Sequence, residues 1–210
     1  MSKISLKYSS FYNFPVTVMR MILASTSPYR QTLLRRLELA FDSQAPQVEE
    51  RALPGESPRA QAGRLAIAKA RDVAASHPGC IVIGSDQVAS LEGVAIGKPG
   101  DFNSARRQLQ QSSGKCLTFY AGLCVIDADG REHNRVTPFQ VQFRRLGDRE
   151  IDRYLKQEEP YDCAGSFKWE GLGIALFEKL SGDDPTALEG LPLIALCDIL
   201  AELGVHPLGA

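Results

Sequence analysis

The order in which short apolar runs alternate with segments of helical spacing most constrains the fold of this 210-residue chain. Residues 21–24 form an apolar run, which predicts a strand. The run breaks into Ser25, Thr26, Ser27 and Pro28, and leucines then recur at helical spacing. Serine is a favoured N-cap and proline suits the first helical position, so a helix should begin at this point. The pattern predicts a strand, a hydroxyl-rich turn and a helix.

The rest of the chain continues in mixed order, as judged from the period of its apolar residues and the turn residues between them. The expected helices follow Ser57-Pro58, run from about Asn103 to Ser112, begin near Asp148, and run from Pro192 to Gly204; the expected strands lie at 81–83, 117–126, 135–143 and 174–177, with a small hairpin turn at Glu92-Gly93. The sequence contains no internal repeat or long linker, so residues 21–210 should form one α/β domain.

Composition excludes several classes of function. Lysine and arginine number 24 against 25 acidic residues, so no basic field exists that would attract nucleic acid or an anionic membrane surface. No apolar stretch approaches the roughly 18 residues that indicate a membrane span. The five cysteines are odd in number and widely spaced, which favours reduced thiols in a cytoplasmic protein. We therefore expect a soluble protein that holds any anionic ligand through local groups.

The first twenty residues differ from the rest of the chain. They begin with two lysines but lack a continuous apolar segment and a small-residue cleavage site, so a secretory signal fits poorly. Met19 and Met21 lie directly before the first predicted strand. We interpret residues 1–20 as a disordered extension or as a start assigned too early.

Two turns carry groups that suit a phosphorylated ligand. Ser25, Thr26 and Ser27, the N–H groups of the following helix and the guanidinium of Arg30 could together cradle a phosphate, although an ordinary capped helix explains the same residues. Asp86 follows the apolar run at 81–83, at the carboxyl end of a buried strand. Open α/β sheets bind ligands at such ends, so this aspartate is either a catalytic group or a turn former.

Further charged residues complete this inventory. Glu49 and Glu50 are candidate metal ligands or a solvated pair in a loop. Lys69 interrupts an apolar helical stripe, from which lysines also extend to solvent, and Lys98 lies in a rigid Gly-Lys-Pro turn. Segment 163–173 is a binding loop or a glycine-rich hairpin. Together these residues offer cations for a polyphosphate, carboxylates for Mg²⁺ and a loop that can recognise a base, which phosphoryl chemistry requires.

With these segments in order, the sequence resembles the Maf family of nucleoside triphosphate pyrophosphatases from residue 21 to about residue 208. The matching pieces are "LASTSPYR" at 23–30, "ERALPGESP" after the first glutamate of the acidic pair, "AIAKA" at 66–70, "GSDQV" at 84–88, "GKP" at 97–99, "SGK" at 113–115 and "AGSFKWEGLG" at 164–173. The resemblance implies an elongated mixed sheet with flanking helices and two lobes around a deep nucleotide-binding cleft. It also implies a homodimer in many cases, and hydrolysis of a nucleoside triphosphate to a monophosphate and diphosphate with Mg²⁺ or Mn²⁺.

The resemblance also implies roles for individual residues. "SDQ" with "SFKWEG" downstream is similar to the branch that hydrolyses 7-methyl-GTP, whereas the dTTP/UTP branch typically carries alanine-aspartate-threonine. Asp86 would be the proton acceptor and, with Glu50, a metal ligand. Lys69 and Lys98 would act on the phosphates. Three positions would be tied to substrate choice, namely Arg30, Gln87 and Glu170.

Alternatives to this interpretation remain open. The chain could act on dTTP, UTP or another modified nucleotide, or it could be a non-catalytic regulator that binds nucleotides. Asp86 favours an enzyme, because it adds a negative charge that phosphate binding alone would not favour.

Three residues depart from the pattern of the family. Glu49 stands where aspartate is usual, Trp169 where this branch commonly has a small residue, and Glu189 where an apolar residue is usual before Gly-Leu-Pro. We expect the first two departures to alter the pocket. Trp169 could stack on a cationic base, or it could cover the surface without touching a ligand.

Overall fold

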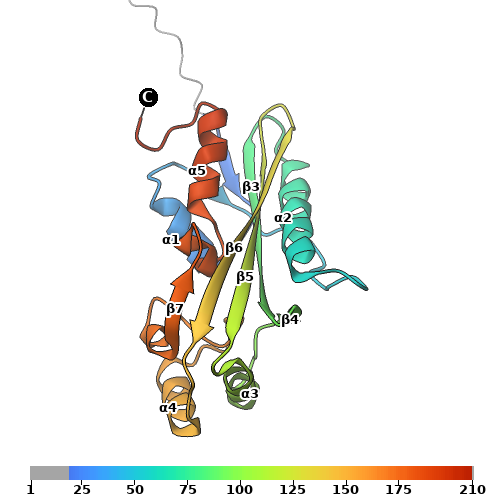
Figure 1. Ribbon diagram of the computed structural model, residues 1–210. Helices are drawn as coiled ribbons and strands as arrows, with labels where there is room; N and C mark the ends of the chain where they lie inside the picture. The colour runs from blue at the N-terminus through green and yellow to red at the C-terminus, as the bar shows by residue number, and fades with distance from the viewer. Residues whose placement is uncertain (1–18, 210) are drawn as a thin grey trace, which may run out of the picture.

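A long mixed β-sheet flanked by helices dominates the computed structural model, which describes residues 19–209 (Figure 1). The strands are β1 (Met21–Leu23), β2 (Asp42–Ser43), β3 (Ile81–Leu91), β4 (Val94–Ile96), β5 (Cys116–Ile126), β6 (Glu132–Phe143) and β7 (Phe177–Ser181). The helices are α1 (Pro28–Arg35), α2 (Pro58–Ala74), α3 (Phe102–Ser112), α4 (Asp148–Glu158) and α5 (Leu193–Glu202), with short 3₁₀ helices η1 (Leu172–Leu176) and η2 (Pro185–Glu189).

The sheet has the strand order β2-β1-β3-β5-β6-β7, and β4 pairs with β3 outside this path. β1 is parallel to both β2 and β3, whereas the other pairs are antiparallel. Figure 1 shows that β3, β5 and β6 run along most of the molecule, which is elongated as a result. The predicted elongated mixed α/β fold is confirmed.

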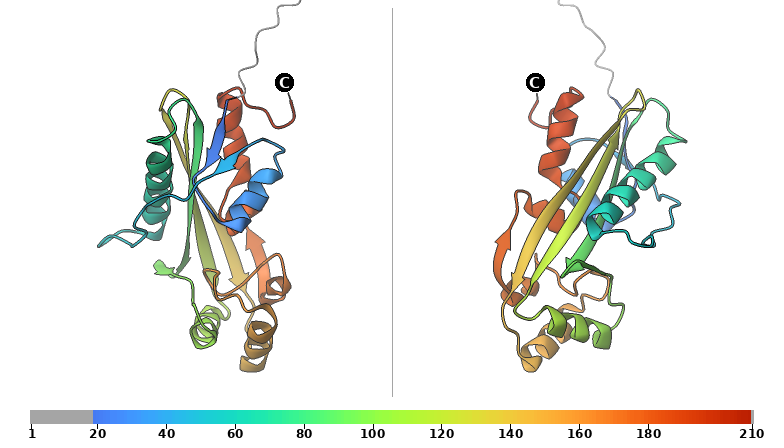
Figure 2. Two further views of the ribbon diagram at one scale, coloured as in Figure 1. Left: turned by 180° about the vertical axis from the view of Figure 1, so that it is seen from behind. Right: turned by 45° about the vertical axis from the view of Figure 1, so that its right-hand side comes forward.

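Side chains of the central strands alternate between two helical layers. Ile81 and Ile83 pack in one apolar cluster with residues of α1 and α5, whereas Val82 packs in another with residues of α2. This alternation follows from the two-residue period of a strand. Figure 2 shows α2 on one side of the sheet and α1 with α5 on the other. Both faces of the strands that lead into Asp86 are therefore covered.

Two glycines allow α2 to lie unusually close to the sheet. A Cβ on Gly84 of β3 would approach the backbone of Ala66 and Ala70 more closely than van der Waals contact allows. A Cβ on Gly122 of β5 would do the same against the carbonyl oxygen of Ala62. The close approach of this helix brings Lys69, which lies one turn after Ala66, to the strand that carries the predicted catalytic aspartate.

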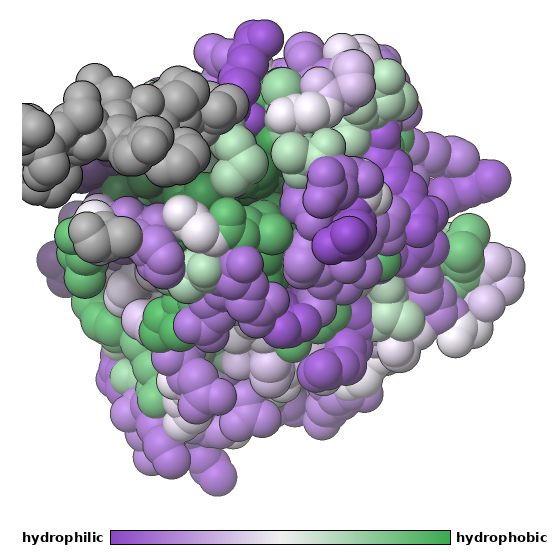
Figure 3. Space-filling model, turned by 90° about the horizontal axis from the view of Figure 1, so that it is seen from above, coloured by the Kyte–Doolittle hydropathy of each residue, from purple (hydrophilic) through white to green (hydrophobic). Residues whose placement is uncertain are grey.

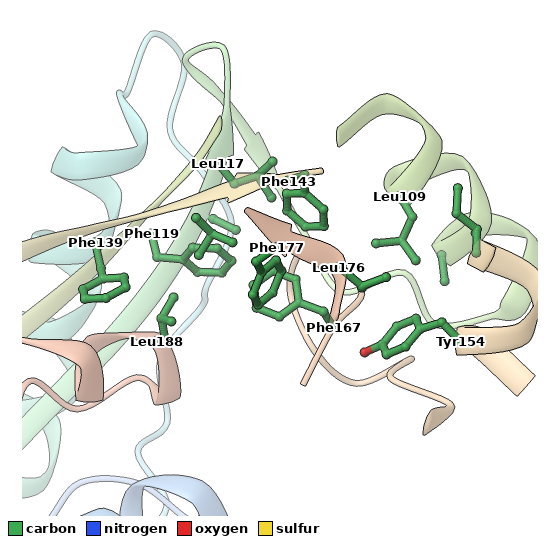
Figure 4. Close-up of a cluster of buried hydrophobic side chains, with 14 of the residues drawn as sticks. Leu109, Leu117, Phe119, Phe139, Phe143, Tyr154, Phe167, Leu176, Phe177 and Leu188 are labelled. Atoms are coloured by element: carbon green, nitrogen blue, oxygen red, sulfur yellow. The ribbon is translucent and has the colours of Figure 1, made fainter. Parts of the chain in front are cut away.

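A separate cluster of aromatic side chains lies where β5, β6 and β7 meet α3 and α4 (Figure 4). The Phe167 ring meets those of Phe119, Phe143 and Phe177 edge to face, with centroid separations of 5.4, 5.7 and 4.8 Å. Such edge-to-face pairs stabilise a core beyond the area that they bury. Phe167 belongs to the predicted binding loop, so this cluster anchors the loop to the sheet.

The apolar residues gather inside these layers rather than over the visible surface. Figure 3 looks onto the end of the molecule that carries α5, where hydrophilic residues predominate and hydrophobic areas are smaller. Within residues 19–209, no helix combines the length and apolarity that a membrane crossing requires.

The structure corrects some sequence-based boundaries. A strand was predicted at 81–83 only, but β3 continues to Leu91 because the added residues pair with β5. Asp86 is therefore inside a strand and not at its carboxyl end. The strand expected at 174–177 is wrong: most of that segment belongs to η1, and β7 follows it. The hairpin turn at Glu92-Gly93 is confirmed by the pairing of β3 with β4.

The predicted extension at residues 1–20 lies almost entirely outside the described residues, so it stays a prediction. Arg20, at its end, is ordered into the fold through its carbonyl oxygen, which accepts from the Ile81 N–H at 2.9 Å. Its side chain pairs with Asp42 at 2.8 Å. The five cysteines, which were predicted to be reduced, are free.

Candidate active site

A pocket of about 760 Å³ lies where the short strand β1 ends beside the continuing strand β3. This volume is within the range of small-molecule sites. The structure brings together the residues that the sequence suggested for the site, with the exception of Glu49, and they line the pocket: Ser25, Thr26, Ser27, Arg30, Glu50, Lys69, Asp86, Gln87, Lys98 and Glu170. They come from six separate segments of the chain.

Lys69 joins the two predicted metal ligands. Its ammonium nitrogen lies 2.7 Å from Asp86 Oδ1 and 2.6 Å from Glu50 Oε1. Lys69 and Asp86 are both buried, whereas Glu50 is largely exposed. The sequence treated Lys69 as a phosphate-binding group, but in this structure its charge is directed to two carboxylates. The attraction between the two buried charges offsets part of the cost of removing them from water.

Burial also changes the pKa of the Asp86 carboxyl. Loss of solvent raises the pKa of this carboxyl above its ordinary value, and the neighbouring Lys69 and Arg30 charges oppose the rise. A raised pKa makes the carboxylate a stronger proton acceptor than an exposed aspartate. The environment of Asp86 therefore suits general-base chemistry.

Arg30 lies in the first turn of α1, just after the β1–α1 turn, and is held in place by the segment that precedes α5. Arg30 Nε donates to the Gly190 carbonyl oxygen at 2.9 Å, and the same oxygen lies 2.7 Å from the hydroxyl of the buried Ser85. Gly190 has a φ of 93°, and a Cβ there would lie 3.2 Å from Arg30 Nε. Glycine is required at this position for both reasons. Arg30 is thus fixed at the pocket by the segment that precedes α5.

The hydroxyl residues of this turn behave differently from one another. Ser27 occupies the predicted N-cap position of α1, but its side chain makes no capping hydrogen bond. The buried Ser25 hydroxyl instead accepts from the Ser27 N–H at 3.1 Å. Thr26 is exposed at the pocket. The turn therefore carries hydroxyls at a helix N-terminus, which suits an anion.

Of the two remaining charged residues, Lys98 lines the pocket and Glu49 does not. Lys98 is exposed on the turn after β4, a turn that Gln108 holds through a 3.1 Å hydrogen bond to the Gly97 carbonyl oxygen. Glu49 pairs with Arg51 at 3.1 Å and does not line the pocket. Only the second acid of the predicted pair therefore reaches the site.

The other end of the pocket is formed by Gln87 and the loop at 163–173. Gln87 Nε2 donates to the Ala187 carbonyl oxygen at 2.6 Å, which fixes the side chain with its oxygen as the acceptor. Trp169 and Glu170 line this end together with the aromatic Phe119 and Phe167. The arrangement combines hydrogen-bond acceptors with aromatic surface, as recognition of a nucleobase requires.

Comparison with known proteins agrees with this geometry. Residues 20–203 match the family described as Maf-like protein. This chain belongs to the Maf family. A Bordetella avium protein named 7-methyl-GTP pyrophosphatase is 54% identical over 90% of this chain and 95% of its own. A Nitrosospira multiformis protein of the same name is 52% identical over 89% of this chain and 95% of its own.

A solved structure shows the same fold outside these Maf relatives. The structure of a HAM1 protein from Coxiella burnetii covers 88% of this chain and 99% of its own, with a TM-score of 0.50 and 18% sequence identity. At this identity the likeness concerns the fold alone.

The carboxylates of this Maf protein suit a hard divalent cation. Mg²⁺ and Mn²⁺ prefer oxygen ligands, and Mg²⁺ commonly uses one or two carboxylates together with substrate phosphates. Glu50 and Asp86 bring two carboxylate oxygens to one point, as their shared contact with Lys69 shows. In residues 19–209, no group of three or more His, Cys, Asp or Glu side chains is placed to hold a metal. The donor set therefore fits a cation that is shared with a substrate.

One acidic residue of this pocket was not among the predicted site residues. Glu189 was noted only as a departure from the Maf pattern, yet it lines the pocket beside Leu188. The charge of Glu189 where an apolar residue is usual was the available signal. Its position could not be foreseen, since it depends on how η2 folds back against β3.

Proposed function

We propose that this Maf protein is a nucleoside triphosphate pyrophosphatase that hydrolyses 7-methyl-GTP to 7-methyl-GMP and diphosphate. The observation that carries the proposal is the buried Lys69–Asp86 pair at one end of a pocket whose other end presents acceptors and aromatic rings. The names of relatives that are more than half identical to this chain support the same substrate. The homodimer and the cytoplasmic location stay predictions.

Asp86 is the proton acceptor in this proposal. Water adds to one phosphorus of the α–β anhydride while its proton passes to the Asp86 carboxylate, the bridging P–O bond breaks, and the monophosphate and diphosphate separate. Burial raises the pKa of the Asp86 carboxyl, which strengthens it as a base, and the contact with Lys69 orients Oδ1. The partly exposed Arg30 and the exposed Lys98 line the pocket and offset the charge of the phosphates.

Glu50 and Asp86 are the residues that would hold a divalent cation, Mg²⁺ or Mn²⁺. When bound, the cation supplies positive charge against phosphate oxygens. The exposed Glu50 reaches Lys69 from a loop, so it can turn toward a bound cation without disturbing the buried pair. Ser25, Thr26 and Ser27 lie beside the anion as hydroxyl donors.

Gln87 and Glu170 recognise the base. The fixed Gln87 oxygen accepts hydrogen bonds from the Watson–Crick edge of guanine, which carries donors at N1 and the exocyclic amino group. Glu170 is exposed at the same end of the pocket and supplies a carboxylate for the same edge. This pairing favours a guanine base over the bases of dTTP and UTP.

A panel of triphosphates tests the proposal. The purified chain with Mg²⁺ or Mn²⁺ should release diphosphate from 7-methyl-GTP with a higher kcat/KM than from GTP, dTTP or UTP. Phosphate-specific and diphosphate-specific assays run on the same samples distinguish the two products. Orthophosphate as the primary product, or a preference for a pyrimidine nucleotide, would overturn the proposal.

A further inference from the structure

Buried polar atoms without a partner gather at the base end of the pocket. Among the described residues, the buried side-chain atoms that lack a hydrogen bond are Ser112 Oγ, Trp169 Nε1 and Glu189 Oε1. The last two line the same pocket, whereas Ser112 does not. An orphaned buried group costs free energy that a bound ligand can recover by pairing with it.

Glu189 is the more costly of the two because it is acidic. Its side chain is only 9% exposed, and the cation that pairs with it among the described residues, Arg36 Nη2, lies 3.7 Å from Oε1, which is beyond hydrogen-bond distance. The Arg36 side chain is 54% exposed, so solvent weakens its charge. Glu170 adds a second negative charge nearby, and it contributes with burial to the raised pKa of Glu189.

The backbone around Glu189 is held firmly. It is the last residue of η2, whose start is capped by the buried Asp184 through a 2.9 Å bond from the Thr186 N–H. Gln87 binds the Ala187 carbonyl oxygen, and Arg30 and Ser85 both bind that of Gly190. The carboxylate is therefore presented on a segment that is tied to the catalytic strand from both sides.

We infer that Glu189 is a specificity-determining residue, whose carboxylate selects a base that carries positive charge and so distinguishes N7-methylguanine from guanine. Methylation at N7 makes the imidazole ring cationic, whereas guanine itself is neutral. A cationic ring supplies the counter-charge that the distant, exposed Arg36 supplies only in part. The inference rests on the proposed function, because it assigns the base of the same substrate.

Binding of the reaction product tests this role without hydrolysis. Trp169 is the only tryptophan of the chain and lines the same end of the pocket, so its fluorescence reports occupancy directly. Dissociation constants for 7-methyl-GMP and GMP would be measured on the full chain with Mg²⁺. We expect Glu189→Gln and Glu189→Leu to reduce the preference for 7-methyl-GMP about tenfold, the loss of one charge-assisted contact. GMP affinity should change by less than about threefold.

Arg36→Gln is the matched control, since it removes the other member of the ion pair. If Glu189 served only to hold this pair, both substitutions would change the affinities alike. The inference predicts that Arg36→Gln keeps or increases the preference, because the pocket becomes more negative. The melting temperature of Glu189→Leu should not fall, since an incompletely paired buried acid is replaced by an apolar side chain.

The outcomes separate the two proposals. A wild-type preference that persists in both Glu189 variants overturns the inference, as does an equal loss in Arg36→Gln. A wild-type chain that binds 7-methyl-GMP no more tightly than GMP overturns it too. Absence of diphosphate release from 7-methyl-GTP counts against the proposed function instead, and the binding data still decide the role of Glu189.

Discussion

The two ends of the pocket treat their polar groups in opposite ways. At the catalytic end, the Lys69 ammonium contacts both Glu50 and Asp86 within 2.7 Å. At the base end, Trp169 Nε1 and Glu189 Oε1 are buried without a hydrogen-bond partner. The charged groups of the first end pair with one another in the folded chain, whereas two buried polar atoms of the second end lack a partner.

This difference indicates how catalysis and recognition are divided. A preorganised charge pair needs no rearrangement when the reaction begins, which lowers the barrier to the chemical step. Unpaired groups at the base end favour the ligand that satisfies them and disfavour one that does not. We therefore expect substitutions at the catalytic end to reduce turnover for every substrate, and those at the base end to alter the choice between substrates.

The largest effect is expected from Asp86→Asn. This change keeps the size of the side chain but removes the proton acceptor, so turnover should fall about 10²-fold or more. Binding of 7-methyl-GMP should remain, because the base end is untouched. Diphosphate release and product binding measured on the same preparation check both statements.

Asp42→Asn is a suitable control for this prediction, since Asp42 forms an exposed pair with Arg20 outside the pocket. Its turnover should match that of the wild type. Full activity in Asp86→Asn would remove Asp86 from the reaction and leave the catalytic end without its base.

The next effect concerns the packing that creates the catalytic end. Gly84→Ala would drive a methyl group into the α2 backbone at Ala66 and Ala70, and overpacking of this kind costs about 1–3 kcal/mol. Movement of α2 would also carry Lys69 away from Asp86. Urea unfolding should show the loss of stability, and kcat should fall with it.

Gly63→Ala distinguishes close packing from the general effect of adding a methyl group to this helix–sheet pair. Gly63 lies on α2, where a Cβ would meet only a methyl group of Val136 at 3.2 Å, and alanine favours a helix interior over glycine. Its stability should equal or exceed that of the wild type. Equal stability in Gly84→Ala would contradict the packing argument.

The sequence predicted much of this framework because its signals are local. Serine followed by proline marked the starts of α1 and α2, and the Ser57 hydroxyl does accept from the Ala60 N–H at 3.2 Å. The length of β3 was underestimated, since its polar residues after Gly84 are held in the sheet by pairing with β5 and not by their own propensity. Contacts between distant segments decide such boundaries.

The distinction between local signals and contacts of distant segments also applies to the site. The predicted residues were found one turn at a time, and the structure brings them into one pocket. The contact of Lys69 with Asp86 depends on a close helix–strand approach that no single segment encodes. Glu189 was missed because it reaches the pocket through η2, whose backbone is fixed by contacts to residues about a hundred positions away.

A smaller effect is expected in the pH profile. Asp86 must be ionised to accept a proton, so activity should rise with pH through its pKa, which burial raises and Lys69 lowers. Lys69→Met removes the lowering contribution, and the acidic limb of kcat/KM should move to higher pH. In Lys98→Met the limb should stay in place, although activity falls. A limb that stays in place or moves to lower pH in Lys69→Met would contradict this assignment.

The smallest effect is expected at Trp169, where two roles can be separated. If the indole stacks on a cationic base, Trp169→Ser should lower the kcat/KM ratio of 7-methyl-GTP to GTP about threefold to tenfold, and Trp169→Phe should keep most of the preference. If the unpartnered Nε1–H instead donates to the ligand, both variants should lose the preference for 7-methyl-GTP equally, because neither serine at this depth nor phenylalanine replaces the indole donor. An unchanged ratio in Trp169→Ser would limit the ring to packing against the aromatic cluster, and the contrast between the two ends would then depend on Glu189 alone.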